Sequence, residues 1–405
     1  MHPINEVAQQ YVKLSLQIGN HCPNFVDAYY GPSQWRETEY ILSLAQIKTQ
    51  LLQVIAQAKQ IAVTVIAKQQ RRYDLLMIQL KAAIVYIDML EGQHLPFYQE
   101  CEALYDAKPT RFDEAHFDQI LAQLEDLVPG QGELNKRIDD YRQQFVIPKD
   151  KLMTVFEAAI NESRHRTLRY IDMPEHENFT VELVSDKVWS AYNWYKGDSY
   201  SVIELNTDLP IQIERAIDLA AHEGYPGHHV FNALMEKHLV DGQGWLEYSI
   251  YNLFSPISLL AEGSANYGIE VAFPWSERLT FEKEVLFPLA QLDPSQCEQY
   301  YQIARELQRL SYSDNMIAQR YLDGEVNDQQ AIELLMKYAL NSEQRAIQRL
   351  KFIKQNRAYV ITYNYGQDLV KQYLQNITND KSGNELWRVF ETLLSQPKTA
   401  SMMLA

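Results

Sequence analysis

The 405-residue sequence contains only three cysteines, Cys22, Cys101 and Cys297, and none of them forms a CxxC pair. This spacing excludes a cysteine-rich zinc cluster. An odd number of distant cysteines in a chain of this length also argues against a disulfide framework. We therefore expect reduced, buried thiols.

The chain also lacks a long apolar run and an excess of basic residues. No stretch approaches the roughly 18 apolar residues of a membrane span, and the first 20 residues lack the pattern of a signal peptide. Lys and Arg number 37 against 53 Asp and Glu, which gives a net charge of -16. Such a charge opposes binding to nucleic acid or anionic lipid. We expect a cytoplasmic protein with no nucleic-acid or membrane partner.

Helical periodicity is abundant. Apolar residues recur at three- and four-residue steps over 47–90 and 115–128, and again over most of the chain after residue 208. Alternating segments at 179–186 and 200–208 predict two strands. The predicted class is mainly α with a small β-sheet, with an N-terminal helical lobe over 1–147 and a catalytic region over 148–405. One continuous domain is the alternative.

The sequence HEGYPGHH, residues 222–229, holds three histidines and a glutamate. It resembles the His-Glu-x-x-His zinc motif, but the fourth residue after His222 is Pro226. On a regular helix, His222 and His228 would point about 120° apart, too far for one metal ion. We therefore predict a broken helix between Gly224 and Gly227, which returns His228 or His229 to the metal.

Residues upstream of His222 carry the signals of a helix N-terminus. Thr207 or Asp208 is predicted to cap it, with Pro210 in its first turn.

A second predicted helix, 258–273, carries Glu262 among small and apolar residues. A carboxylate is costly to bury without a partner, and it is a common third ligand beside two histidines. We predict a zinc site of His222, His228 and Glu262, with Mn²⁺ or Co²⁺ as alternatives. Zinc lowers the pKa of water towards 7, and Glu223, next to a ligand, is positioned to act as general base in amide hydrolysis.

Together, HEGYPGHH and AEGSANYGIE (261–270) resemble the bacterial family known as domain of unknown function 885, which is similar to gluzincin zinc metallopeptidases. Segments 25–32, 163–171, 191–210 and 357–366 carry the resemblance over most of the chain. The spacer between the histidines is longer than the two residues typical of gluzincins.

The resemblance implies a zincin-like fold, with two helical lobes around a cleft and a small sheet beside the active-site helix. It implies that 200–206 is an edge strand that pairs with an extended peptide substrate. The resemblance and the need for an oxyanion donor point to Tyr363, with Tyr359 or Tyr365 as alternatives.

Three further residues, His229, Glu270 and Asn206, are assigned to the surroundings of the metal or the substrate, whereas His238 is expected at the surface. The leading function is a zinc peptidase for short peptides. The alternatives are a zinc hydrolase of a non-peptide amide or ester and a non-catalytic binding protein on the same fold.

Overall fold

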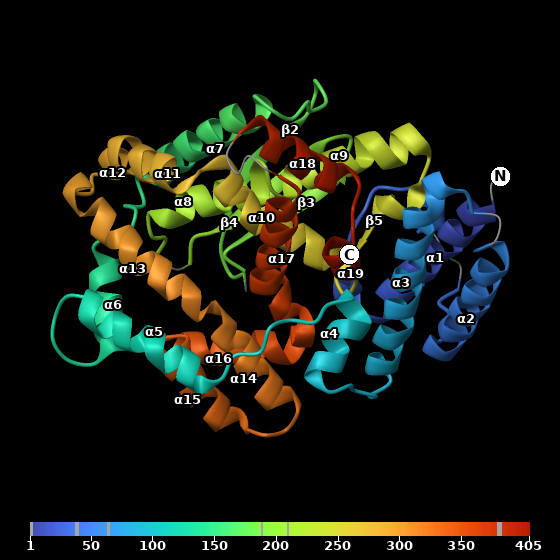
Figure 1. Ribbon diagram of the computed structural model, residues 1–405, viewed down its shortest axis with the longest axis horizontal. Coiled ribbons are helices and arrows are strands. Elements are labelled where there is room, and N and C mark those ends of the chain that lie inside the picture. Colours follow the sequence, from blue (N-terminus) through green and yellow to red (C-terminus); the bar gives the residue numbers. More distant parts are fainter. Residues whose placement is uncertain (1–2, 37–39, 63–64, 188, 209, 379–382) are drawn as a thin grey trace.

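The computed structural model describes residues 3–36, 40–62, 65–187, 189–208, 210–378 and 383–405. In these residues the protein is mainly helical with two small β-sheets (Figure 1), which confirms the predicted mainly α class. Each helix in this part of the chain is too short or too polar to cross a lipid bilayer.

The α-helices follow the predicted apolar periodicity. In chain order they are α1 (Pro3–His21), α2 (Leu44–Ile61), α3 (Ala67–Leu90), α4 (Phe97–Tyr105), α5 (Glu114–Leu127), α6 (Leu134–Gln143), α7 (Leu152–Leu168), α8 (Glu214–Leu219), α9 (His228–Met235), α10 (Pro256–Ala272), α11 (Trp275–Phe281), α12 (Phe287–Leu289), α13 (Cys297–Arg309), α14 (Ser313–Leu322), α15 (Asp328–Tyr338), α16 (Glu343–Asn356), α17 (Ile361–Ile377), α18 (Asn384–Ser395) and α19 (Ala400–Leu404).

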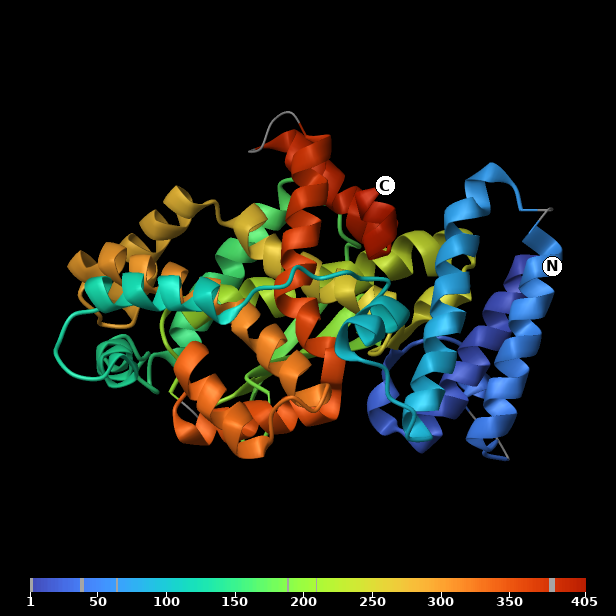
Figure 2. The same ribbon diagram turned by 60° about the horizontal axis from the view of Figure 1, so that its bottom comes forward.

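The first 147 residues do not gather in one lobe. Helices α1, α2 and α3 pack together at one end of the molecule, whereas α5 packs against α13 and α15 at the other (Figures 1 and 2). One hydrophobic core runs through all of these parts. The division into a lobe over 1–147 and a region over 148–405, with one continuous domain as its alternative, stays a prediction.

A three-stranded sheet contains β2 (Asn178–Val184), β3 (Ala191–Gly197) and β4 (Tyr200–Asn206) in the order β2-β4-β3. β2 runs parallel to β4, and β3 runs antiparallel to it. The prediction of two strands near 179–186 and 200–208 is confirmed, but the prediction that 200–206 is the edge strand is wrong. A tight hairpin at Asp198 and Ser199, both with positive φ, places β3 beside β4, so β4 is central and β3 is one of the two edge strands.

A second sheet pairs β1 (Val26–Tyr29) with β5 (Ile250–Asn252), two strands that the sequence pattern did not predict. They are only four and three residues long, too short for an alternation signal. Since β1 also lies against β3, this sheet brings the N-terminal part of the chain to the edge strand.

The helix predicted to start near Thr207 begins only at Glu214. Gln212 instead forms an isolated antiparallel bridge with Val146, and the backbones of Ile211 and Ile213 form hydrogen bonds with Ile147 and Phe145. A pairing partner more than 60 residues away therefore overrides the local capping signal.

Two glycines allow α10 and α17 to cross at close range. A Cβ atom built on Gly263 would lie 2.4 Å from backbone atoms of Gly366, and one on Gly366 would lie 2.8 Å from the carbonyl oxygen of Leu259. Larger side chains would force the helices apart. This close contact holds the start of α17, with its tyrosines, against the α10 turn that carries Glu262.

Candidate metal centre

The helix that carries His222 is broken where the sequence predicts. α8 passes into a π-helical turn, Ala220–Gly224, and α9 starts at His228 after an extended residue and a cis peptide bond before Pro226. Gly227 fits the return of the chain, since a Cβ atom there would lie 1.9 Å from the carbonyl oxygen of His222. The interruption brings the imidazole of His228 back to that of His222.

Three predicted ligands converge. The Nε2 atoms of His222 and His228 are 3.1 Å apart, and Glu262 Oε2 lies 3.3 Å from the first and 3.7 Å from the second. All three ligand atoms lie within 4.8 Å of one another. Helices on both sides of the break and α10 thus supply one cluster.

This cluster fits a divalent transition metal. Ligand atoms about 2.0–2.1 Å from a tetrahedral ion are about 3.3 Å apart, close to the distances found here. Glu262 Oε2 is buried and has no hydrogen-bond partner among the described residues. A buried carboxylate oxygen without a donor is costly, and a cation would compensate it.

Neighbouring side chains fix two of the ligands. Nδ1 of His222 donates to the carboxamide oxygen of Asn266 at 2.9 Å, which leaves the lone pair of Nε2 directed at the cluster. The hydroxyl of Tyr359 donates to Glu262 Oε1 at 2.7 Å, which leaves Oε2 free. Asn266 was not predicted, although its position four residues after Glu262 places it on the same helical face.

The electrostatics of the metal-free cluster reflect this proximity. Burial raises the pKa of the Glu262 carboxyl, but the imidazoles of His228 and His222 outweigh burial and hold it well below its usual range. Burial lowers the pKa of His228, and the carboxylate of Glu262 reverses the effect and raises it. The site is therefore arranged to hold positive charge beside Glu262.

His229 points away from this cluster, so His228 is the second predicted ligand. Its Nε2 lies 3.0 Å from Glu177 Oε2, and its Nδ1 lies 2.9 Å from the hydroxyl of Ser201 on β4. Tyr225 and Arg164 also donate to Glu177, at 2.5 and 2.6 Å. This His229–Glu177 network ties the interrupted segment, through Tyr225, to the sheet and to α7.

Glu223 and Tyr363 both line the cavity that contains the cluster. Glu223 is 6% exposed, and its carboxylate has no hydrogen-bond partner in the described part of the chain. Its backbone carbonyl accepts a hydrogen bond from Asn193 of β3 at 2.7 Å. Burial, and next the charge of Glu262, raise the pKa of Tyr363 well above its usual range, so its hydroxyl stays protonated and able to donate.

Asp27 of β1 is a residue of this site that sequence reasoning missed. It lines the same cavity and accepts a hydrogen bond from the hydroxyl of Tyr192 on β3. Burial raises the pKa of its carboxyl to about 7; His228 lowers it, and Glu262 and Glu223 raise it further. The segment FVDAYYGP drew attention only as a whole, because nothing local shows that β1 reaches the edge strand.

Two assigned residues, Asn206 and Glu270, form hydrogen bonds or ion pairs with groups outside the cluster. Asn206 donates to the carbonyl oxygens of Lys187 and Trp189, which stabilises the loop before β3. Glu270 pairs with Lys371 at 2.7 Å, two turns along α10 from Glu262.

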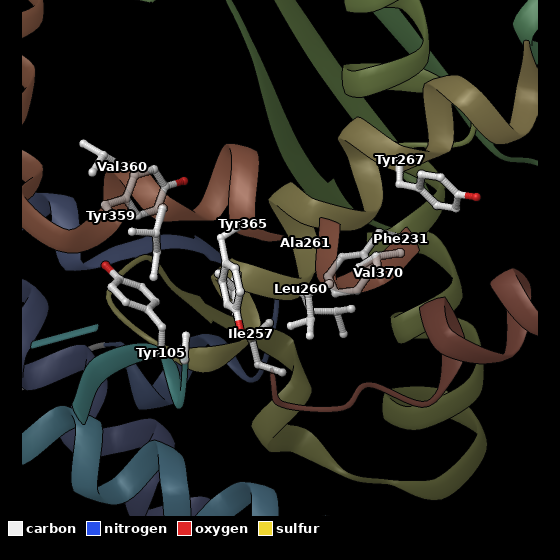
Figure 3. Close-up of a cluster of buried hydrophobic side chains, with 14 of the residues drawn as sticks. Tyr105, Phe231, Ile257, Leu260, Ala261, Tyr267, Tyr359, Val360, Tyr365 and Val370 are labelled. Atoms are coloured by element: carbon white, nitrogen blue, oxygen red, sulfur yellow. The ribbon is translucent and has the colours of Figure 1, made fainter. Parts of the chain in front are cut away.

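Tyr365, an alternative to Tyr363, and His238, expected at the surface, both lie outside the lining of the cavity. Tyr365 lies beside Ile257 in a buried cluster and does not line the cavity (Figure 3). His238 is exposed, as predicted.

The cavity around the cluster has a volume of about 1810 Å³. Residues of β1 and β3 form its wall near Asp27, and it extends past the cluster to α7, α8, α11, α13 and α16. The volume exceeds the roughly 300–1,000 Å³ typical of small-molecule sites, so a ligand of several residues fits.

Comparisons with known proteins give the fold but no function. No family model matches the chain, and no curated protein matches it. Among solved structures, the chain is similar to a protein described as "the putative lipoprotein from Colwellia psychrerythraea", with a TM-score of 0.58 and 13% sequence identity. The alignment covers 89% of this chain and 68% of that one. At this level of identity the likeness shows a shared fold alone.

Proposed function

We propose that the protein is a zinc-dependent peptidase of the zincin type that hydrolyses short peptides, as the resemblance to domain of unknown function 885 implies. The observation that carries the proposal is the convergence of His222, His228 and Glu262 Oε2, a buried oxygen without a hydrogen-bond donor in the described residues. When bound, the metal supplies Lewis-acid chemistry to a water molecule and to a carbonyl oxygen.

Glu223 acts as general base and then as general acid. Its carboxylate accepts a proton from water while the water oxygen forms a bond to the peptide carbonyl carbon. It returns this proton to the amide nitrogen while the carbon–nitrogen bond breaks. The hydrogen bond from Asn193 to the Glu223 carbonyl supports this placement, because it ties the residue to the edge strand.

Tyr363 is proposed to donate a hydrogen bond to the oxyanion. The ring centroid of Tyr359 lies 5.6 Å from that of Tyr363, but the Tyr359 hydroxyl already donates its hydrogen bond to Glu262. The edge strand β3, of which Ala191, Asn193 and Trp194 line the cavity, is proposed to pair with the extended substrate in place of 200–206.

The substitution Glu223→Gln tests the proposal. We expect the purified variant to keep about one zinc per chain while hydrolysis of a peptide mixture falls by at least about 10²-fold, the lower range of general acid–base contributions. Glu270→Gln is the matched control, since this carboxylate lines the same cavity but is paired with Lys371. Wild-type protein that binds zinc and cleaves no peptide, or a fully active Glu223→Gln variant, would overturn the proposal.

A further inference from the structure

The charges around the metal centre do not balance. Asp27, Glu223 and Glu262 line one cavity, and the adjacent β3 residues Tyr192 and Asn193 form hydrogen bonds with Asp27 and Glu223. In the described residues, no lysine or arginine forms an ion pair with any of the three, and Glu262 is paired only with histidines. A bound divalent ion offsets at most two of the negative charges that these three carboxylates can carry.

Two acidic residues elsewhere in the same cavity have counter-charges. Asp218 pairs with Arg278 at 2.8 Å, and Glu270 pairs with Lys371 at 2.7 Å. Asp27 and Glu223 differ from these two residues, because neither forms an ion pair with a lysine or arginine in the described part of the chain. An uncompensated negative charge in a largely buried position favours a ligand that brings a positive charge.

Two buried polar groups in this region also lack partners. The Glu223 side chain, in a residue that is 6% exposed, has no hydrogen-bond partner in the part of the chain that the structure describes. The side-chain oxygen of Asn193, in a residue that is 9% exposed, is buried without a donor. Both residues line the cavity, so a ligand with N–H groups would find acceptors here as well as negative charge.

We propose that Asp27 binds the free α-ammonium group of a peptide, so that the protein is an aminopeptidase. This inference rests on the proposed function. The α-ammonium of a peptide lies two bonds from its first carbonyl carbon. A peptide whose first carbonyl lies at the His222–His228–Glu262 cluster therefore places its ammonium among the groups beside that cluster. The hydroxyl of Tyr192 holds Asp27 by hydrogen bond, and the second carboxylate oxygen remains for the ammonium.

Matched peptides test the assignment. Zinc-loaded wild-type protein is given a mixture of tripeptides that vary at the first residue, and the same mixture with acetylated N-termini. We expect the free peptides to be cleaved after their first residue, at least about tenfold faster than the acetylated ones. Asp27→Asn, an isosteric change, should lower kcat/KM for the free peptides by roughly 10- to 100-fold and leave the acetylated ones unchanged.

A binding measurement gives a second readout that needs no turnover. Leucine hydroxamate and its analogue without the amino group bind metals through the same hydroxamate, so only the ammonium distinguishes them. Calorimetry should show tighter binding of leucine hydroxamate to wild-type protein, and Asp27→Asn should remove the difference. Glu270→Gln is the control, and it should retain the difference.

The outcomes separate this inference from the proposed function. Equal cleavage of free and acetylated peptides would refute the role of Asp27 and leave a peptidase. If acetylated peptides are cleaved only when their first residue is lysine, the bound cation is a side-chain ammonium. This result would refute the assignment of the bound cation to the α-ammonium group. If no peptide is cleaved, the hydroxamate pair still decides, since equal affinities in wild-type protein and Asp27→Asn would refute the inference.

Discussion

Two histidine–glutamate clusters lie beside the same break in the helix, and they differ in how their polar atoms are paired. In the His229–Glu177 network, both imidazole nitrogens have partners, and Glu177 is bonded by three side chains. In the metal centre, Glu262 Oε2 has no hydrogen-bond donor within the described ranges of the chain. The polar atoms of the first cluster are all paired with protein groups, whereas the second has an unpaired oxygen that suits the proposed cation.

The pKa values reflect this difference in part. Burial raises the pKa of Glu177, but hydrogen bonds from His229, Tyr225 and Arg164 outweigh it and hold the pKa below the usual value. Glu262 is stabilised as an anion by the imidazoles of His228 and His222, which are the same groups that would coordinate a metal ion. The comparison teaches that residue type does not distinguish a ligand from a structural pair. What distinguishes a candidate ligand is that its side-chain atoms converge with others that also lack hydrogen-bond partners.

The same substitution in each cluster gives the sharpest contrast, and the larger effect is expected at Glu262. Glu262→Gln should reduce bound zinc from about one per chain to nearly none, because it replaces a charged ligand with a neutral amide. The measurement is metal analysis after dialysis against a weak chelator. Full occupancy in this variant would show that Glu262 is not a ligand and would remove the difference between the clusters.

The next largest effect is expected at Tyr363. Tyr363→Phe should lower kcat by roughly 10²–10³-fold with little change in KM, since the hydroxyl meets a charge that develops in the transition state. Tyr365→Phe is the matched control, because this ring lies in the buried cluster and does not line the cavity. If kcat is unchanged in Tyr363→Phe for any peptide that the wild-type protein cleaves, Tyr363 is not the oxyanion donor.

The smallest effect on the metal is expected at Glu177. Glu177→Gln should retain about one zinc per chain, with an affinity at most about 10- to 100-fold lower, the range found for outer partners of a metal site. Thermal or denaturant unfolding should show a loss of about 1–3 kcal/mol, because donors in the network lose an anionic acceptor. If Glu177→Gln loses zinc as completely as Glu262→Gln, the two clusters are not separable.

Much of the metal centre could be predicted from local sequence. The spacing of His222 and His228 excludes a regular helix, and Gly224, Pro226 and Gly227 supply a break. The burial pattern around Glu262 favours a partnered carboxylate. These inferences succeed because ligand geometry and helix geometry are both fixed by covalent chemistry over a few residues.

The remaining assignments depended on contacts between distant segments. Which of His228 and His229 faces the cluster follows from Glu177 and Ser201, which hold His229 on the opposite side. Asn206 was assigned to the site, but its amide is used by the loop before β3. No local pattern reveals such partners.

The sequence by itself determined that the chain is mainly helical, that its helix breaks before His228, and that His222, Glu262 and one of His228 and His229 are the candidate ligands. Tertiary structure decided that β3 and not β4 lies at an edge of the sheet, which of His228 and His229 faces the cluster, that Tyr359 donates to Glu262, and that Asp27 lies at the same cavity. The physical reason is the separation along the sequence of the residues that interact. Backbone breaks and helical faces are set by neighbours within a few residues, whereas a site assembled from β1, β3, α10 and α17 exists only after the chain has folded.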